Sequence, residues 1–438
     1  MKKSSGQNLY LKAKELIPGG TMLLSKRPEM FLPDNWPSYF SKAKDVFVWD
    51  LDDNKFIDTS IMGIGTNSLG YGNENVDNAV LRAVSLGNMS TLNCPEEVYL
   101  AEKLVEIEPW AEMVRFARSG GEANSIAIRI ARAASGKDGV AYCGYHGWHD
   151  WYLSANHNSK EDELKYQLLP GLSTDGVPKA LKNTSFPFYY NDIESLKTIL
   201  RNQSIGVIKM EVFRNIEPEP EFLHNVRKLA NQYNAVLIFD ECTSGFRETF
   251  GGLYKKYNVI PDLAMFGKTL GNGYAITAVI GKREVMDSVQ KTFISSTFWT
   301  ERIGPVAALE SLKEMERHKS WEIISEKGQK VKNIWKELSE SFDIPIKVSG
   351  LNAIATFSFD SENHNLFKTY LTQEMLKKGF LATTAFYSCI KHDQEILNEY
   401  QNHLGDVFNN INKHRKGEID INRLLEGPVC HNGMKRLN

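Results

Sequence analysis

The sequence is poor in cysteine and has no long apolar run. Its five cysteines stand scattered at positions 94, 143, 242, 389 and 430, and no two have the spacing of metal ligands. We therefore expect free thiols in a reducing compartment. No apolar signal core follows the first six residues, and no stretch approaches bilayer-spanning length. Disulfide-stapled and membrane-spanning folds are thus excluded, and a cytoplasmic protein without a membrane partner is expected.

Neither sign of charge predominates in the chain. It has 52 Lys and Arg against 54 Asp and Glu, a formal net charge of −2. Because nucleic acids and anionic membranes attract a basic surplus, we expect neither as a partner. What is present, 42% hydrophobic and 24% charged residues among 438, is typical of a globular protein with two or three domains.

Two short apolar runs end in residues that can do chemistry. Residues 236–239 lead directly into Asp240, and residues 263–266 lead through Gly267 into Lys268. Short, wholly apolar runs bounded by turn signals predict buried parallel strands. Ligand sites in such sheets lie outside the carboxyl ends of the strands. We therefore expect Asp240 and Lys268 side by side at one edge of a sheet.

An acid and an amine in this arrangement suit pyridoxal phosphate. That cofactor needs a lysine to form a Schiff base with its aldehyde, and a carboxylate to keep its ring nitrogen protonated. Lys268 is the candidate Schiff-base lysine and Asp240 the candidate partner of the ring nitrogen. Two other interpretations stay open at this point, a buried ion pair and two unrelated charges at strand ends.

The stretch that contains Asp240 and Lys268 also allows a different interpretation, as part of a nucleotide hydrolase. The acidic strand end at Asp240 resembles a magnesium site, and Gly267-Lys268-Thr269 resembles the end of a phosphate loop. That loop requires a glycine five places before its Gly-Lys pair, where this chain has Asp262. The loop would also follow the acidic strand instead of preceding it. We therefore reject the interpretation as a nucleotide hydrolase.

A glycine-rich turn earlier in the chain suits a phosphate group. Residues 113–117 predict a strand, 118–122 a turn, and the Ala- and Ile-rich stretch 123–134 a helix. This order leaves free backbone N–H groups at the positive end of a helix, where phosphates bind. Glycine turns are common, so the turn gains weight from its agreement with the interpretation of Lys268.

The next predicted strand, 140–143, leads to an aromatic and histidine-rich segment. The ring of Tyr145 is suited to stacking on a pyridine ring. His146 and His149 favour a metal site only weakly, because no further set of ligands follows. Residues 154–185 form a long polar loop, which in an ordered domain is typical of a functional lid.

Other stretches predict the remaining elements by their periodicity. We expect strands at 205–211 and 353–359, an edge strand at 275–281, and helices at 221–233, 303–317, 321–342, 366–378 and 393–411.

With these pieces in place, the sequence resembles the class III, fold-type I pyridoxal phosphate aminotransferases, and among them glutamate-1-semialdehyde aminomutase. The similarity covers nearly the whole chain. The motifs that carry it are Pro18-Gly19-Gly20, the turn 119–123, Tyr145-His146-Gly147, Gly176-Val177-Pro178-Lys179, Phe239-Asp240-Glu241, Gly245-Phe246-Arg247 and Pro261-Asp262-Leu263 followed by Gly267-Lys268.

The resemblance implies an α/β fold. Its large cofactor-binding domain, 61–305, would hold a mostly parallel seven-stranded sheet covered by helices. A smaller α+β domain would occupy 306–438, and an N-terminal segment with a helix and a hairpin would occupy 1–60.

The resemblance also assigns roles to individual residues. Catalysis falls to Lys268 and Asp240. The cofactor-binding residues that it implies are Gly120 and Gly121 at the phosphate, Tyr145 and Cys242 on the two faces of the ring, Asp240, Lys268 and Thr297. Thr297 resembles the threonine that reaches the phosphate in the neighbouring subunit, which implies a homodimer with shared active sites.

Several positions depart from the family pattern. Gly121 stands where the family has Ser or Thr, and Val212 where it has proline. The arginine that holds the substrate carboxylate in aminomutases has only Lys26 and Arg27 nearby, in an altered frame, and Tyr387 replaces an acid. The cofactor site is therefore retained more fully than the substrate site.

These differences favour an aminotransferase that moves an amino group from an amino donor to an aldehyde or ketone acceptor. An aminomutase that moves nitrogen within one molecule is the alternative, and a non-catalytic protein that kept the fold is a third class. The sequence does not name the donor or the acceptor.

Overall fold

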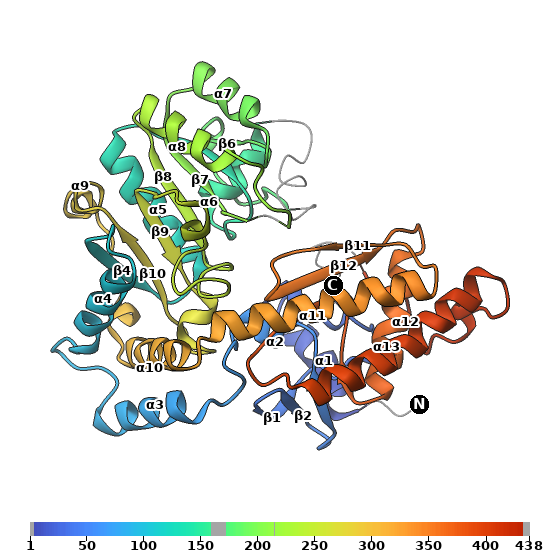
Figure 1. Ribbon diagram of the computed structural model, residues 1–438. Helices are drawn as coiled ribbons and strands as arrows, with labels where there is room; N and C mark the ends of the chain where they lie inside the picture. The colour runs from blue at the N-terminus through green and yellow to red at the C-terminus, as the bar shows by residue number, and fades with distance from the viewer. Residues whose placement is uncertain (1–3, 159–171, 214, 432–438) are drawn as a thin grey trace. The chain divides into compact units, whose positions relative to one another are not determined.

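The structure, a computed structural model, describes residues 4–158, 172–213 and 215–431 (Figure 1). It divides into two compact units, one of Met1–Asn73 with Glu322–Asn438 (unit 1) and one of Glu74–Trp321 (unit 2). The sequence predicts domain borders after residues 60 and 305. In the structure the N-terminal residues and the C-terminal residues belong to the same unit, unit 1. Among the described residues, no helix is long and apolar enough to cross a bilayer.

Unit 2 contains a seven-stranded sheet in the order β4-β10-β9-β8-β7-β5-β6. The strands are β4 (Met113–Ala117), β5 (Gly139–Cys143), β6 (Ser185–Pro187), β7 (Ile205–Met210), β8 (Val236–Glu241), β9 (Leu263–Phe266) and β10 (Thr277–Gly281). The strands β9, β8, β7, β5 and β6 are neighbours in this order and pair in parallel. β10 is antiparallel to both of its neighbours, β4 and β9. The predicted mostly parallel sheet of seven strands is confirmed.

The prediction of an edge strand at 275–281 is wrong. β10 lies between β4 and β9, and each of its five residues is buried. A short apolar strand has the same sequence pattern at the edge and in the middle of a sheet, because the pattern indicates burial and not which strands are its neighbours.

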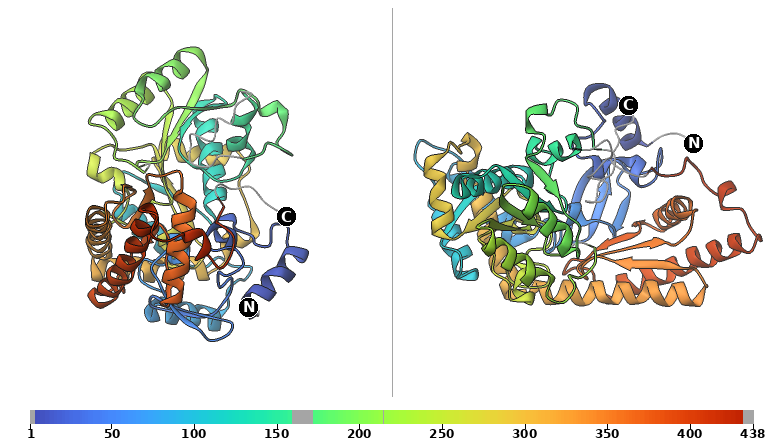
Figure 2. Two further views of the ribbon diagram at one scale, coloured as in Figure 1. Left: turned by 90° about the vertical axis from the view of Figure 1, so that its right-hand side faces the viewer. Right: turned by 90° about the horizontal axis from the view of Figure 1, so that it is seen from above.

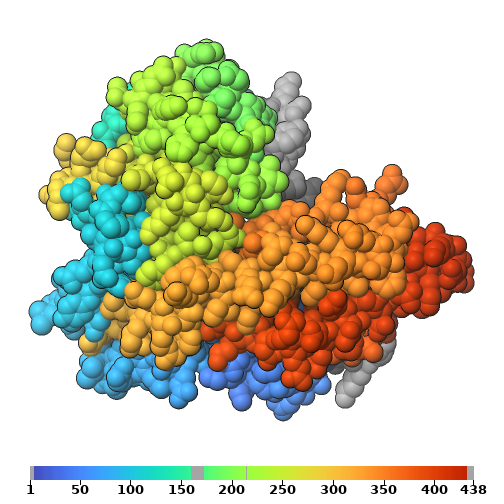
Figure 3. Space-filling model, viewed as in Figure 1, coloured from blue at the N-terminus to red at the C-terminus, as the bar shows by residue number. Residues whose placement is uncertain are grey.

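Helices cover both faces of this sheet. α5 (Gly120–Ser135) packs along one face against β4 and β7 to β10, while α7 (Ile193–Asn202) and α8 (Phe222–Gln232) pack against β5 and β8 (Figures 1 and 2). In the space-filling view the light green residues of α7 and α8 form much of the visible surface of unit 2 (Figure 3). The other helices of this unit are α3 (Glu74–Leu86), α4 (Glu96–Ile107), α6 (Asp150–Leu153), α9 (Arg283–Met286) and α10 (Ile303–His318).

Part of the predicted lid, residues 159–171 of the loop 154–185, lies outside the described residues. The described flanks of that loop contain short 3-10 turns at Ser154–His157 and Lys179–Leu181.

Unit 1 is an α+β unit with two small sheets. One has the order β1-β2-β3-β13 and the other β11-β12-β14. Its strands are β1 (Phe40–Lys44), β2 (Phe47–Asp50), β3 (Lys55–Asp58), β11 (Ile346–Ser349), β12 (Ile354–Phe359), β13 (Phe380–Leu381) and β14 (Ala385–Tyr387). Its helices are α1 (Ser5–Leu16), α2 (Met62–Gly65), α12 (His364–Lys377), α13 (Gln394–Arg415) and most of α11 (Ser320–Ser341).

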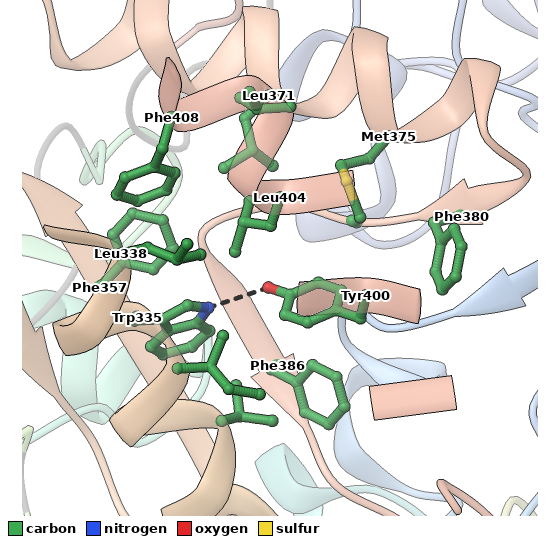
Figure 4. Close-up of a cluster of buried hydrophobic side chains, with 14 of the residues drawn as sticks. Trp335, Leu338, Phe357, Leu371, Met375, Phe380, Phe386, Tyr400, Leu404 and Phe408 are labelled. Carbon is green, nitrogen blue, oxygen red and sulfur yellow. Dashed lines mark hydrogen bonds between the residues drawn. The ribbon is translucent and has the colours of Figure 1, made fainter. Parts of the chain in front are cut away.

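A large apolar core holds the elements of unit 1 together. Trp335 of α11 and Tyr400 of α13 are both fully buried in it, and the indole Nε1 of Trp335 donates a hydrogen bond of 3.0 Å to the Tyr400 hydroxyl (Figure 4). The ring of Phe357 of β12 packs against Trp335 at a tilt of 53°, with ring centroids 4.8 Å apart. The predicted helix and hairpin of the N-terminal segment, α1 and β2–β3, belong to this unit.

Candidate active site

The carboxyl ends of β8 and β9 bring the two predicted catalytic residues to one edge of the sheet. The strands pair in parallel, with Asp240 opposite Met265 and Glu241 opposite Phe266. Lys268 follows two residues after Phe266. Every residue of both strands is buried, which is why their sequences are wholly apolar up to the sheet's edge.

Asp240 is a buried carboxylate with three donors around it. Its side chain is 4% exposed. Oδ2 lies 2.8 Å from Nδ1 of His146 and 3.5 Å from Nζ of Lys209, and Oδ1 accepts a 3.1 Å hydrogen bond from the Cys242 N–H. Burial alone would raise the pKa of Asp240, but Lys209, His146 and the Cys242 N–H outweigh it and lower that pKa. Asp240 is therefore ionised at neutral pH, as a partner for a protonated ring nitrogen must be.

Lys268 has the properties of a reactive amine. Its Nζ donates a 2.9 Å hydrogen bond to the hydroxyl of Thr243. Burial, followed by the positive charge of Arg247, lowers the pKa of Lys268 to about 8. The neutral amine, which the attack on an aldehyde requires, therefore forms at a much lower pH than for an ordinary lysine.

The glycine turn caps α5 as the sequence predicted. Ser119 and Glu122 form a capping box, in which each side chain accepts a hydrogen bond from the other's backbone N–H. The first N–H groups of the helix, at Gly120 and Gly121, remain at its positive end. A Cβ on Gly120 would stand 3.7 Å from the Cys242 sulfur, so the turn lies beside the residue that follows the Asp240 strand.

Gly121 is packed against aromatic rings. A Cβ at this position would stand 3.1–3.2 Å from the rings of His149 and Trp148, closer than side chains normally approach. The glycine therefore leaves room beside the turn for the indole N–H of Trp148 and the ring of His149.

Tyr145 is held at the same edge by the loop that follows β5. Its backbone N–H donates a 3.0 Å hydrogen bond to the Glu211 carboxylate, and its ring, 37% exposed, meets Tyr152 edge-on. Gly144 has a φ of +113°, and a Cβ there would collide with Glu211. Only glycine fits this turn, and the turn presents the Tyr145 ring outward.

Cys242 lies between the two glycine segments of the site. A Cβ on Gly267 would stand 3.2 Å from its sulfur, much as one on Gly120 would stand 3.7 Å away. Burial, and then the neighbouring Asp240 charge, raise the pKa of the Cys242 thiol well above its usual value. It is therefore a protonated, uncharged group that can pack against a ring.

Thr297 lies exposed at the start of a short 3-10 turn, Thr297–Thr300. This segment is tied to the glycine turn, because Arg118 donates to the Trp299 and Glu301 carbonyls at 2.9 Å each and the Trp299 indole donates to Glu122. Thr297 is thus available to another chain. Its contact with a partner's cofactor stays a prediction.

Four residues of this site were missed as such in the sequence: His146, Lys209, Thr243 and Arg247. The sequence suggests for His146 a weak metal site and a place in a family motif, and for Lys209 a place in a strand, but neither pattern indicates a contact with Asp240. The signal for Lys209 was available, since a lysine in the buried run 205–210 needs a carboxylate partner. The departures at Lys26, Arg27 and Tyr387 fall in unit 1.

These residues fit pyridoxal phosphate. The edge offers an amine of lowered pKa, an ionised carboxylate, an outward aromatic ring and a helix start with free N–H groups, each of which matches one part of that cofactor.

Comparison with known proteins gives a consistent result. The family model described as aminotransferase class-III matches residues 33–392. The 3-aminobutyryl-CoA aminotransferase of Cloacimonas acidaminovorans is 34% identical over 412 residues, 91% of this chain and 95% of that protein. A glutamate-1-semialdehyde 2,1-aminomutase of Methanococcus maripaludis is 30% identical over 430 residues, 92% of this chain and 97% of that one.

Solved structures agree on the fold. The PLP form of the FumI protein from Sphingopyxis sp. MTA144 superimposes with a TM-score of 0.83 at 22% identity, covering 96% of this chain and 99% of that one. An omega-transaminase from Sphaerobacter thermophilus gives a TM-score of 0.81, also at 22% identity, covering 92% and 97%. At that identity the likeness demonstrates a shared fold.

Proposed function

The chain belongs to the class III aminotransferases, which are pyridoxal 5′-phosphate enzymes, and from that premise we propose that Lys268 and Asp240 carry its reaction. The observation that carries this proposal is their arrangement on adjacent parallel strands, with the pKa of Lys268 lowered to about 8 and Asp240 ionised. When bound, the cofactor supplies an electron sink for the charge left when a proton leaves the amino donor.

Lys268 has two tasks in this proposal. Its Nζ would hold the cofactor, and in the neutral form it would accept the proton from the α-carbon of the amino donor. Thr243 orients the amine through its 2.9 Å hydrogen bond. The lowered pKa serves both tasks, because only the neutral amine can attack a carbonyl or accept a proton.

Asp240 holds the ring nitrogen in its protonated form. Cys242 N–H and His146 fix its two oxygens, so the carboxylate has little freedom to turn away. In this buried place an ion pair is stronger than in water. His146 is a positioning residue here, because it acts on the ring only through Asp240.

The other predicted residues bind the remaining parts of the cofactor. Gly120 and Gly121 would offer backbone N–H groups to the phosphate, and Tyr145 and Cys242 would pack against the ring. The capping box at Ser119 and the bond from Tyr145 to Glu211 support these assignments, because they fix the two loops.

We further propose a cytoplasmic homodimer in which Thr297 reaches the phosphate in the other subunit. Its support is the number of exposed hydrophobic side chains in residues 81–99 and 293–298 of unit 2, which a monomer would leave in water. Those that are more than half exposed are Leu81, Val84, Leu86, Leu92, Val98, Tyr99, Phe293 and Phe298. All five cysteines are free, as a reducing compartment requires.

The substrate side of the proposal is an amino donor and an aldehyde or ketone acceptor. One relative is named a 3-aminobutyryl-CoA aminotransferase and others glutamate-1-semialdehyde aminomutases. The former name favours transfer between two molecules, and a β-amino acyl thioester is the donor class that it suggests. Transfer within one molecule is the second candidate, on the strength of the latter names.

Product analysis with and without an added amino donor distinguishes the two candidates. We expect conversion of a carbonyl acceptor only when a donor such as a β-amino acid or its thioester is present. Turnover of a single amino aldehyde with no donor would show that the protein is an aminomutase. A protein that binds the cofactor but converts none of the donor and acceptor pairs would contradict both.

A further inference from the structure

Lys209 is a fully buried lysine in the middle of the sheet. It lies on β7, between Tyr142 of β5 and Ile238 of β8, and its side chain has no exposed surface. Its Nζ lies 3.0 Å from the sulfur of Met265 and 3.5 Å from Oδ2 of Asp240. A thioether is a weak acceptor, so Asp240 is the group that offsets the buried charge.

Within the described part of the chain, Asp240 is the best partner available to Lys209. α5 covers this face of the sheet with apolar side chains, including Ile126, Ala127 and Ile130. The charges of Asp240, Cys242 and Glu211 act on Lys209, His146 is coupled to it, and Tyr142 is its neighbour on β5. Glu211 is committed to the Tyr145 loop. Cys242 is a protonated thiol, and burial, followed by the charge of Lys209, lowers the pKa of His146. Asp240 is thus the carboxylate against which Lys209 is placed.

Two cations then meet at one carboxylate once the cofactor is bound. In the proposed function Asp240 also receives the protonated ring nitrogen. The like charges of that nitrogen and of Lys209 repel each other, and burial strengthens the repulsion. Lys209 should therefore stabilise the cofactor-free protein and weaken the binding of the cofactor. A neutral side chain at this position would do neither.

We propose that Lys209 is the internal counter-ion of Asp240 and a positioning residue that competes with the cofactor's ring nitrogen for this carboxylate. It keeps Asp240 charged and in place before the cofactor arrives and limits how tightly the cofactor is held afterwards. The inference rests on the proposed role of Asp240 and adds to it a residue that tunes cofactor retention.

The test measures the affinity of the cofactor-free protein for pyridoxamine 5′-phosphate, which forms no covalent bond to Lys268. We expect Lys209→Met to bind it about tenfold more tightly than wild type, or about 1.4 kcal/mol, and the cofactor-free variant to melt at a lower temperature. A merely structural lysine would lower the melting temperature without tightening the binding. Unchanged or weaker binding by Lys209→Met overturns the proposal.

A cofactor analogue with carbon in place of the ring nitrogen isolates the cause. Lys209→Met should gain no affinity for this analogue, and an equal gain for both compounds would overturn the proposal. If the wild-type protein binds both compounds equally, the proposed role of Asp240 at the ring nitrogen is contradicted. This outcome is distinguishable from a failure of the proposal on Lys209 alone. Should the methionine variant not fold, Lys209→Gln is judged by the same comparison.

Lys255→Met is the matched control. Lys255 pairs with the buried Glu108 at 3.1 Å in the same unit. Its loss also removes the cation from a buried carboxylate, so the melting temperature should fall. The affinity for pyridoxamine 5′-phosphate should not change. An equal gain in affinity in both variants would show that any loss of a buried ion pair produces it, and would contradict the special place of Lys209.

Discussion

At the scale of single residues, the reactivity of Lys268 depends on the charges around it. Burial and the neighbouring guanidinium of Arg247 lower the pKa of Lys268 to about 8. The amine therefore loses its proton as pH rises through about 8, and the neutral form that attacks an aldehyde is populated above that pH. Arg247 is 1% exposed, so solvent does little to screen its charge.

Replacing Arg247 should raise the pKa of Lys268. In Arg247→Met the repulsion is lost, so the pH midpoint for incorporation of pyridoxal phosphate into cofactor-free protein should move up by roughly one pH unit. The incorporation rate, followed by absorbance from pH 6 to 10, measures this. Arg247→Lys keeps the positive charge and should keep the midpoint near that of wild type. A midpoint that stays at about 8 in the methionine variant would show that burial alone sets the pKa.

The two glycines of the phosphate turn differ in the space around them. A Cβ at Gly121 meets the rings of His149 and Trp148 at 3.1–3.2 Å, whereas one at Gly120 meets the Cys242 sulfur at an ordinary 3.7 Å. Overpacking costs about 1–3 kcal/mol. Gly121→Ala should therefore weaken cofactor binding roughly tenfold, and Gly120→Ala clearly less, in an equilibrium titration. Equal losses in the two variants would refute this account of the turn.

At the scale of elements, α11 and α13 are joined by a buried polar contact. The Trp335 indole donates to the Tyr400 hydroxyl at 3.0 Å, and both side chains are fully buried. Tyr400→Phe leaves the indole N–H without an acceptor, which costs about 1–3 kcal/mol. The urea midpoint of unit 1 should fall accordingly.

A second tyrosine of the same core provides the control. Tyr370 accepts a 3.0 Å hydrogen bond from Asn410, which is only partly buried, so water can replace the lost hydroxyl. Tyr370→Phe should cost less than Tyr400→Phe. The opposite order would show that the buried indole contact does not stabilise this core.

Sequence patterns predicted the elements of the site better than the contacts between them. The runs before Asp240 and Lys268 are apolar because both faces of their strands are covered, and this alone predicted two parallel strands at one edge. The predicted edge position of β10 was wrong, because an apolar run does not indicate which strands lie beside it. Pairing across the sheet also hid the contact of His146 and Lys209 with Asp240, because these residues are far apart in the chain.

At the scale of the whole molecule, the proposed dimer shares residues between its active sites. Thr297 would serve the cofactor bound by the other chain, while Lys268 serves its own. A mixture of Lys268→Met chains and Thr297→Ala chains should then form hybrid dimers in which one site has both residues intact.

Activity on mixing measures this sharing. Each variant alone should be weakly active or inactive, and subunit exchange should restore up to about half a dimer's activity, because one of the two sites is repaired. Mixing Lys268→Met with Asp240→Asn chains is the control. Each of these changes disables the site of its own chain, so both sites of the hybrid lack a catalytic residue and the hybrids should stay inactive. Full activity of Thr297→Ala alone would rule out the shared site.

The covalent attachment point tests the central claim most directly. Protein loaded with pyridoxal phosphate is reduced with borohydride, digested and analysed by mass spectrometry. The account predicts a phosphopyridoxyl group on Lys268, and no such label in the Lys268→Met variant. A label on another lysine, with Lys268 unmodified, would contradict the account.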